Sequence, residues 1–213
     1  MSKVTLVWAT PSAEERIAHM ARVSNPANQN NTATASKLLK YLVANKHWSP
    51  FEMVNICMEI ETTRDIARQI LRHRSFSFQE FSQRYAVAEG FEASLARKQD
   101  VKNRQNSIPL DVYNSDADRY LAVWWEGAQD RVLNDVQFLY QAALDKGIAK
   151  EVARKLLPEG LTTSRMYMNG TVRSWIHYCD IRCDDATQLE HREVALACRE
   201  IVKSVVPSLF DLI

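Results

Sequence analysis

The sequence predicts an α+β fold in which helices surround a small, mainly antiparallel sheet. Few segments alternate between apolar and polar residues as strands do, and helical segments outnumber them. The regular strand–helix rhythm that is typical of a parallel α/β sheet is missing. No repeat, low-complexity tract or shift in composition divides the chain, so we expect one domain over residues 1–213.

The first half is predicted to contain two strands and three helices. Ser12 followed by Glu15 forms a capping box, a pattern that marks the start of a helix. Thr62 with Asp65 marks the start of a later helix in a similar way. The expected elements are a strand over residues 4–8, a helix from Ser12 to Val23, a loop over 25–31, a helix over 33–45, a strand over 54–60 and a helix from Thr62 to Arg72. The side chains expected to face the core are Leu38, Leu39, Leu42, Val43, Ile66, Ile70 and Leu71.

The segment after the third helix is predicted to be irregular. Phe76 and Phe78 alternate with serines as in a strand, but the parity of the polar positions has changed by Glu80. A regular strand cannot change parity without a bulge or bend. We therefore expect a turn near Gln79, in a polar segment of the kind where sites are built.

The second half is predicted to be mainly helical. A surface excursion over residues 89–110 precedes a long helix, which carries apolar residues at helical spacing and ends at Gly147. The expected elements are this helix over 116–145, a short helix over 150–157, a strand-like stretch leading to Gly170, and helices over 171–182 and 187–205.

Composition limits how this chain can bind phosphate. It has five glycines, and no two lie closer than Gly160 and Gly170, so a Rossmann G-x-G-x-x-G or a P-loop is excluded. A net charge of +1 gives no overall field that would recruit nucleic acid or an anionic membrane. Arginine outnumbers lysine 17 to 10, and guanidinium groups make fixed bidentate contacts with phosphate. Side chains must therefore hold any phosphate that this protein binds.

Cysteine usage and the termini indicate the cellular setting. The four cysteines form no C-x-x-C pair, and the N-terminus has no signal-peptide pattern, so we expect reduced thiols in the cytoplasm. No apolar run approaches the roughly 20 residues of a membrane span. Zinc would need Cys179 and Cys183 together with His177 and His191; packing roles are favoured, and we expect no metal site.

The segment from residue 64 to 84 carries the strongest chemical signal. Arg64, Arg68 and Arg72 lie on one helical face, a pattern that is also typical of solvated surface. Three serines follow by position 82, and converging guanidinium and hydroxyl donors suit a phosphate dianion. Gln69 or Glu80 is suited to reading the polar edge of a nucleobase. The residues alone therefore favour a pocket for a phosphorylated small molecule.

The run Arg72-His73-Arg74, followed after seven residues by Ser82, resembles the signature of the flavin-dependent thymidylate synthases. Other blocks that look like this family occur in the expected order along nearly the whole chain. They are Ala21-Arg22-Val23-Ser24, His47 with Ser49-Pro50-Phe51-Glu52, Gln69, Gln83-Arg84-Tyr85, Glu151-Val152-Ala153-Arg154 with Leu157-Pro158, and Arg173 to Arg182.

The resemblance implies a homotetramer with FAD at the subunit interfaces and dUMP stacked on the flavin. In this family NADPH reduces the flavin, and methylene tetrahydrofolate gives a methylene group to the uracil ring. The reduced flavin then supplies the hydride that completes the methyl group of dTMP. The resemblance implies small-molecule substrates and no nucleic-acid or membrane partner.

Carried over by position, the resemblance assigns a role to individual residues. Arg182 would be catalytic, because a guanidinium at the N3 and O2 edge of the pyrimidine stabilises the negative charge that develops when C5 becomes nucleophilic. His47 is also open to a packing role. The implied dUMP-binding residues are Gln69, Ile70, Leu71, Arg72, Glu80, Phe81, Ser82, Gln83, Arg84, Arg154 and Arg182. The implied FAD-binding residues are Ser24, His47, Ser49, Arg72, His73, Arg74, Ser75, Glu80, Thr171, Val172, Arg173 and His177.

A serine in a signature motif can be a catalytic nucleophile, but the sequence does not favour that role for Ser82. Activation would need an adjacent base, and His73 lies nine residues away without a third member of a triad. We expect Ser82 to donate a hydrogen bond to phosphate or base.

The chain departs from the family pattern at three places. Thr171 stands where many members have Asn, Ala186 where a histidine is common, and Phe78-Gln79 where an acid-polar pair is usual. These departures bear on the adenine and folate contacts.

Two other functions compete with this interpretation. A conventional thymidylate synthase needs a cysteine nucleophile in a basic pocket, and none of the four cysteines has such flanks. A single-strand nucleic-acid module is suggested by arginines interleaved with Phe76, Phe78, Phe81 and Tyr85. The near-zero net charge, with basic residues confined to one segment, counts against it.

Overall fold

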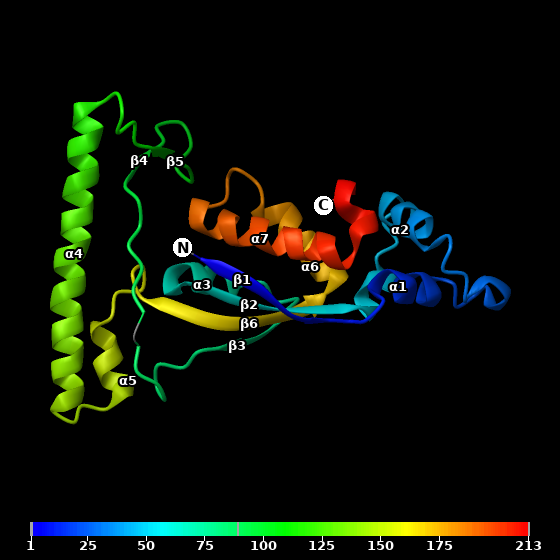
Figure 1. The fold of residues 1–213 in the computed structure, drawn as a ribbon, viewed down its shortest axis with the longest axis horizontal. Coiled ribbons are helices and arrows are strands. Elements are labelled where there is room, and N and C mark those ends of the chain that lie inside the picture. Colours follow the sequence, from blue (N-terminus) through cyan, green and yellow to red (C-terminus); the bar gives the residue numbers. More distant parts are fainter. Residues whose placement is uncertain (1, 89, 213) are drawn as a thin grey trace.

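One antiparallel sheet of four strands forms the centre of the chain (Figure 1). In the computed structural model, which describes residues 2–88 and 90–212 and side chains up to Leu209, the strand order is β1-β2-β6-β3. The strands are β1 (Lys3–Ala9), β2 (Asn55–Thr63), β3 (Ser77–Glu80) and β6 (Thr163–Thr171). The predicted α+β class with a small antiparallel sheet is confirmed.

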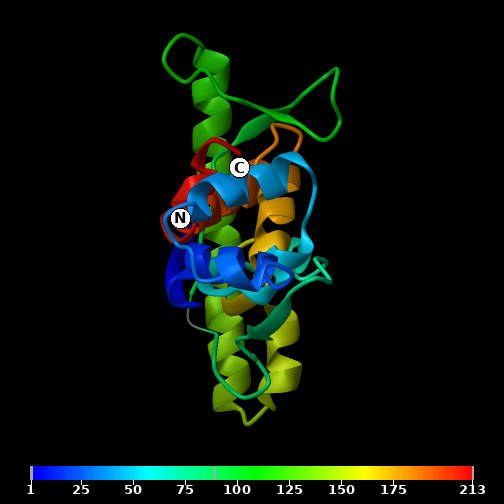
Figure 2. The same ribbon diagram turned by 90° about the vertical axis from the view of Figure 1, so that its right-hand side faces the viewer.

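The helices lie on one face of this sheet and at its two ends. Helices α6 and α7 cover the face, α1 and α2 lie at one end, and α4 stands upright at the other with α5 beside it; Figure 2 shows α4 upright from the second direction. The helices are α1 (Ala13–Ala21), α2 (Ala35–Ala44), α3 (Arg64–Ile70), α4 (Asp116–Asp145), α5 (Lys150–Ala153), α6 (Val172–Arg182) and α7 (Leu189–Val205). Short 3-10 helices occupy Pro26–Asn28, Ser49–Met53, Arg154–Leu156 and Pro207–Leu212.

The main core lies between the sheet and its helices. Alternate residues of β2 and β6 point to the same side, and Met58 on β2 pairs with Met168 on β6. Leu39, Leu42, Ile66 and Ile70 are buried here as predicted, because each lies on the apolar side of its helix. The three other residues expected in the core pack against it only half-buried, namely Leu38, Val43 and Leu71.

Gly170 lets an aromatic ring approach the sheet closely. A Cβ atom added to Gly170 would lie 2.3 Å from the ring of Phe76. That ring packs edge-on against Trp175 of α6, with centroids 4.8 Å apart. Gly170 therefore allows the loop between α3 and β3 to be fixed between β6 and α6.

Two predicted helix starts are wrong in their details. Ser12 precedes α1 in the left-handed conformation, with φ of 51°, and its side chain makes no capping hydrogen bond. A capping side chain normally needs extended backbone at this position. Thr62 is still part of β2; the residue that precedes α3 is Thr63, whose hydroxyl donates to Asp65 over 2.5 Å. Both helices also end two residues earlier than expected.

The turn predicted near Gln79 is replaced by a regular strand. Ser77 to Glu80 pairs with β6 in continuous register. Glu80 occupies an inward position because its carboxylate accepts a hydrogen bond from Ser164 at 2.8 Å and lies 3.6 Å from Arg64 Nη1. A paired carboxylate thus takes the place of an apolar residue, and the parity of the strand never changes.

The second half follows the prediction closely at its long helix. Helix α4 has the expected bounds, and Gly147 follows it with a positive φ of 81°. Part of the predicted excursion forms a hairpin of β4 (Arg97–Gln99) and β5 (Ser107–Pro109). Glu89, the first residue of that predicted excursion, lies outside the described residues. No helix of the described chain is long and apolar enough to cross a membrane.

Candidate active site

The basic run sits in a tight loop that follows α3. The amide of His73 donates to the Ile70 carbonyl at 3.0 Å, and that of Phe76 donates to the His73 carbonyl at 3.3 Å. This path turns His73 inward and leaves Arg72 and Arg74 exposed. Neither guanidinium has a hydrogen-bond or ion-pair partner among the described residues, so both are available to an anionic ligand.

His73 holds Arg182, the last residue of α6. Arg182 Nε donates to His73 Nε2 over 2.9 Å, so the proton of the neutral ring must be on Nδ1. The pKa of His73 is lowered to about 4, first by burial and then by the charges of Arg182 and His177. A neutral imidazole therefore orients the guanidinium. Neither Nη of Arg182 has a partner in the described chain.

Gln69 is fixed beside this pair by two side chains from the start of α7. Its Nε2 donates to Gln188 Oε1 at 2.7 Å, and its Oε1 lies 3.2 Å from His191 Nδ1. His191 is fully buried, and its Nε2 lies 3.2 Å from the Tyr178 hydroxyl. The Tyr178 ring also packs edge-on against His73 at 4.9 Å. Helices α3, α6 and α7 thus meet in one polar cluster.

A second polar cluster lies where the chain leaves β3 and where α5 begins. Arg84 Nε is 3.5 Å from a carboxylate oxygen of Glu151, and Arg154 Nε donates to the Glu151 carbonyl at 3.3 Å. The Ser82 oxygen accepts a 3.4 Å hydrogen bond from the Arg84 amide. Gln83 is buried, and its Nε2 has no partner in the described structure.

The residues implied for FAD lie mainly around the start of α6. Thr171 caps this helix by accepting from the Ser174 amide at 3.2 Å, and the Ser174 hydroxyl donates to the Ser75 carbonyl at 3.2 Å. Arg173 forms an ion pair with Glu52. Val172 is fully buried, and its amide donates to the Val54 carbonyl. The remaining implied positions, all exposed, are Ser24, His47, Ser49 and His177.

Two of these residues answer questions that the sequence left open. His47 is exposed, and its ring lies edge-on to Tyr41, so it is not a packed core residue. Thr171, which stands where many family members have Asn, has a structural role, because its hydroxyl caps α6.

The residues implied for dUMP divide into two groups within one chain. Gln69, Arg72 and Arg182 belong to the first cluster, whereas Ser82, Arg84 and Arg154 belong to the second. Glu80 is the last residue of β3, and the amide of the next residue, Phe81, donates to the Arg165 carbonyl at 2.8 Å. No hydrogen bond or ion pair among the described residues joins the two clusters.

Sequence reasoning missed the residues that support Gln69. His191 was weighed only as a zinc ligand, and among the described residues no group of three or more His, Cys, Asp or Glu side chains could hold a metal. The burial of His191 could be predicted from the sequence, because residues 191, 194, 195, 198 and 202 follow helical spacing and form the buried stripe of α7. A histidine at a core position needs polar partners, and Tyr178 and Gln69 supply them.

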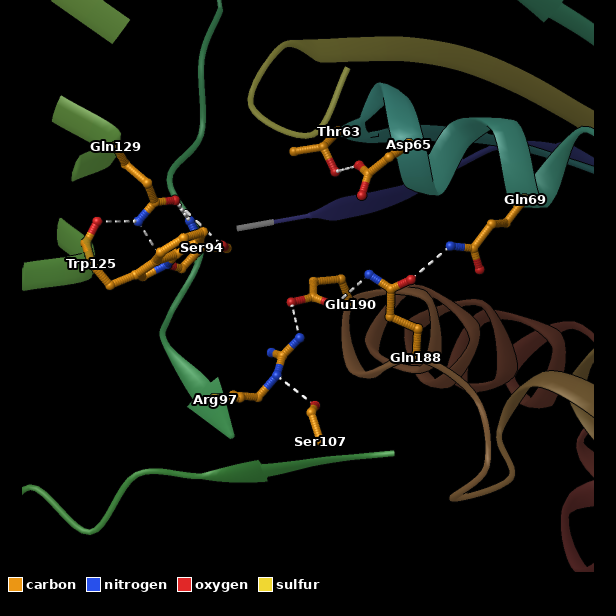
Figure 3. A network of polar contacts seen from close by, with 10 residues as sticks. All are labelled: Thr63, Asp65, Gln69, Ser94, Arg97, Ser107, Trp125, Gln129, Gln188 and Glu190. Carbon is orange, nitrogen blue, oxygen red and sulfur yellow. Dashed lines mark hydrogen bonds and ion pairs between the residues drawn. The ribbon is translucent and has the colours of Figure 1, made fainter. Parts of the chain in front are cut away.

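A cavity of about 630 Å³ lies between α4 and the body of the chain, beside the first cluster. Figure 3 shows its polar lining. Gln129 and Trp125 of α4 hold Ser94, and Arg97 of β4 donates to Glu190 at 2.5 Å. These polar groups are satisfied by one another, so they fix the segment around Ser94 to α4.

Comparison with known proteins places the chain in a family. A family model described as "Thymidylate synthase complementing protein" matches residues 5–208. Flavin-dependent thymidylate synthase from Synechocystis sp. is 53% identical over 198 residues, 93% of this chain and 88% of the relative. Probable flavin-dependent thymidylate synthase from Paramecium bursaria Chlorella virus 1 is 51% identical over 205 residues, 96% of this chain and 92% of the relative.

A solved structure with a similar fold agrees with this family assignment. The UMP/dUMP methylase PolB from Streptomyces cacaoi, bound with 5-Br dUMP, superimposes with a TM-score of 0.82 at 25% identity, covering 99% of this chain and 95% of that one. The chain therefore belongs to the thymidylate synthase complementing proteins. Within that family it is an enzyme of the flavin-dependent thymidylate synthase class, which confirms the resemblance.

Proposed function

We propose that this enzyme methylates dUMP to dTMP, with FAD as its flavin, methylene tetrahydrofolate as the carbon donor and NADPH as the reductant. The observation that carries the proposal is the Arg182 guanidinium, held at Nε by a neutral His73 with both Nη groups left for a ligand. The relatives named flavin-dependent thymidylate synthase and the PolB structure with bound 5-Br dUMP support this substrate and cofactor.

The donor set around the basic loop fits FAD. Its diphosphate is anionic, and the exposed guanidinium groups of Arg72 and Arg74 have no internal partner among the described residues. Ser75, Arg173 and His177 extend this polar surface. When bound, the flavin supplies the hydride that completes the methyl group.

Arg182 is proposed to stabilise charge on the pyrimidine. Its Nη groups would donate to the O2 and N3 edge while C5 becomes nucleophilic, and a donor set in advance costs no reorganisation at that moment. Since His73 has a lowered pKa, it stays neutral and accepts from Nε instead of competing for the anionic edge.

The dUMP phosphate is assigned to the second cluster. Arg84 and Arg154 are the cations there, and both use Glu151 as a support. Ser82 stands beside them as a hydroxyl donor with no base in contact among the described residues, so it is proposed to bind and not to attack. The other binding residues implied by the resemblance keep their assigned roles.

We propose that the enzyme is a homotetramer in the cytoplasm, with sites shared between subunits. The separation of Arg72 and Arg182 from Arg84 and Arg154 supports this, because a second copy could bring one chain's second cluster to another chain's first. Four free thiols agree with a reducing compartment.

A spectrum and a turnover assay test the proposal. Purified protein reconstituted with FAD should show flavin absorbance, and dUMP with methylene tetrahydrofolate and NADPH should give dTMP. Protein that stays colourless with added FAD, or oxidises NADPH without forming dTMP, would refute the proposed function.

A further inference from the structure

A continuous line of hydrogen bonds connects the core to the β4–β5 hairpin through Gln69. It starts at the Tyr178 hydroxyl and His191, and passes through Gln69 to Gln188. From there Gln188 Nε2 donates to Glu190 Oε2 at 3.1 Å, and Arg97 Nη2 donates to Glu190 Oε1 at 2.5 Å. Figure 3 shows the part of this line from Gln69 to Arg97 and on to Ser107.

The carboxylate of Glu190 sets the direction of every bond in the line. An ionised carboxylate only accepts, so the Gln188 atom that faces it must be Nε2. The other end of that amide, Oε1, then faces Gln69 and must receive a hydrogen. Gln69 Nε2 is therefore the donor toward Gln188, and Gln69 Oε1 is left facing His191.

His191 completes the sequence of donors. Since Gln69 presents an oxygen, the ring must donate from Nδ1, and its Nε2 is then free to accept from the Tyr178 hydroxyl. Burial first, and then the charges of Arg182 and His73, lower the pKa of His191 to about 3. A single ring proton is thus present at neutral pH, and the Glu190 carboxylate, three hydrogen bonds away, determines which ring nitrogen carries it.

We propose that His191 and Glu190 are positioning residues that hold the Gln69 amide with its nitrogen toward the ligand. One Nε2 hydrogen of Gln69 goes to Gln188, and the other is left to donate outward from the half-buried side chain. Gln69 would therefore select an acceptor oxygen of the bound nucleotide. This part rests on the proposed function, because it names dUMP as the nucleotide.

The orientation itself is tested without any substrate. In enzyme labelled with ¹⁵N-histidine, the signals of His191, assigned by their loss in His191→Asn, should show a protonated Nδ1 and an unprotonated Nε2. Glu190→Gln should weaken this preference, because an amide can also donate and no longer forces the direction. A ring protonated at Nε2 in the unsubstituted enzyme, or an imidazolium at pH 7, would overturn the proposal.

Binding of dUMP to the FAD-loaded enzyme tests the consequence. His191→Leu should weaken dUMP binding about tenfold, and His191→Asn, whose Nδ2 can replace the ring donor, should restore most of it. Glu190→Gln, at a half-buried position, should also weaken binding, whereas Glu193→Gln, exposed one turn further along α7, should not.

The outcomes separate this inference from the proposed function. Failure of the unsubstituted enzyme to bind dUMP refutes the function, while the tautomer of His191 still decides the orientation. Normal dUMP binding that His191→Leu and Glu190→Gln leave unchanged refutes the positioning role. Equal loss in His191→Leu and His191→Asn, with matching losses of thermal stability, also refutes it by showing a packing effect only.

Discussion

At the scale of single residues, the arrangement of Arg182 depends on a histidine that stays neutral. His73 accepts the Nε–H, which leaves the planar fork of the guanidinium to the ligand. Arg182→Lys should lower kcat for dTMP formation by about 10² to 10³, the range seen when one preorganised donor is lost. FAD content and the unfolding temperature should change little. A lysine variant with kcat within threefold of the original would contradict the role of Arg182.

The half-buried His73 and the buried His191 also make stability depend on pH. His73 and His191 have folded pKa values of about 4 and about 3, below the ordinary 6.5, so the unfolded chain binds their protons first on acidification. Their contribution to stability is present above pH 6.5 and is lost as the pH falls toward those values. Each histidine adds a slope of at most about 1.4 kcal/mol per pH unit. The free energy of unfolding, measured with guanidinium chloride at several pH values between 7 and 4.5, should fall less steeply with decreasing pH in His191→Leu than in the unsubstituted enzyme. The same dependence on pH in both proteins would contradict this prediction.

Residue patterns in the sequence could predict the basic loop but not the hydrogen-bonded residues that hold Gln69 beside it. The signature around Arg72 was readable because its residues are adjacent in sequence. The line from His191 to Glu190 was not, because it joins residues more than a hundred positions apart, such as Gln69 and Gln188. The turn predicted near Gln79 was wrong for a related reason. Glu80 looked like an outward-facing polar residue, but its partner Arg64 lies on another element and keeps it inward on β3.

At the scale of elements, boundaries were predictable where local chemistry decides them. Helix α4 has its predicted bounds because the Ser115 hydroxyl caps its start and Gly147 takes a positive φ after its end. The capping box at Ser12 failed because the chain reaches α1 in a left-handed turn that adjacent residues do not reveal.

Gly170 offers a prediction about how the sheet positions the basic loop. Gly170→Ala would place Cβ against Phe76, and such overpacking should destabilise the fold by about 1–3 kcal/mol. Phe76→Leu in the same chain should recover part of the loss by making room. Gly127→Ala is the matched control, since nothing lies within 4 Å of the new Cβ and alanine favours a helix. Chemical unfolding measures all three, and equal effects at Gly170 and Gly127 would contradict the steric argument.

At the scale of the whole molecule, α4 carries an apolar surface that the described chain leaves uncovered. Trp124, Leu139 and Phe138 are 56%, 50% and 73% exposed. Helical periodicity in the sequence identifies such a face but does not say what covers it. Apolar surface of this extent is typical of an interface, and a second copy of the chain is the covering that the proposed tetramer supplies.

Phe138→Asp therefore tests the assembly and the shared site together. A charge on this face should split the proposed tetramer into smaller species in analytical ultracentrifugation, because burying an unpaired carboxylate in an apolar interface is costly. If Arg84 and Arg154 of one subunit complete the dUMP site of another, turnover should fall with the loss of tetramer and recover at high protein concentration. Asp130→Asn, exposed on the same helix, should leave both unchanged. A Phe138→Asp enzyme that is smaller than a tetramer and fully active at every concentration would show that one chain holds a complete site.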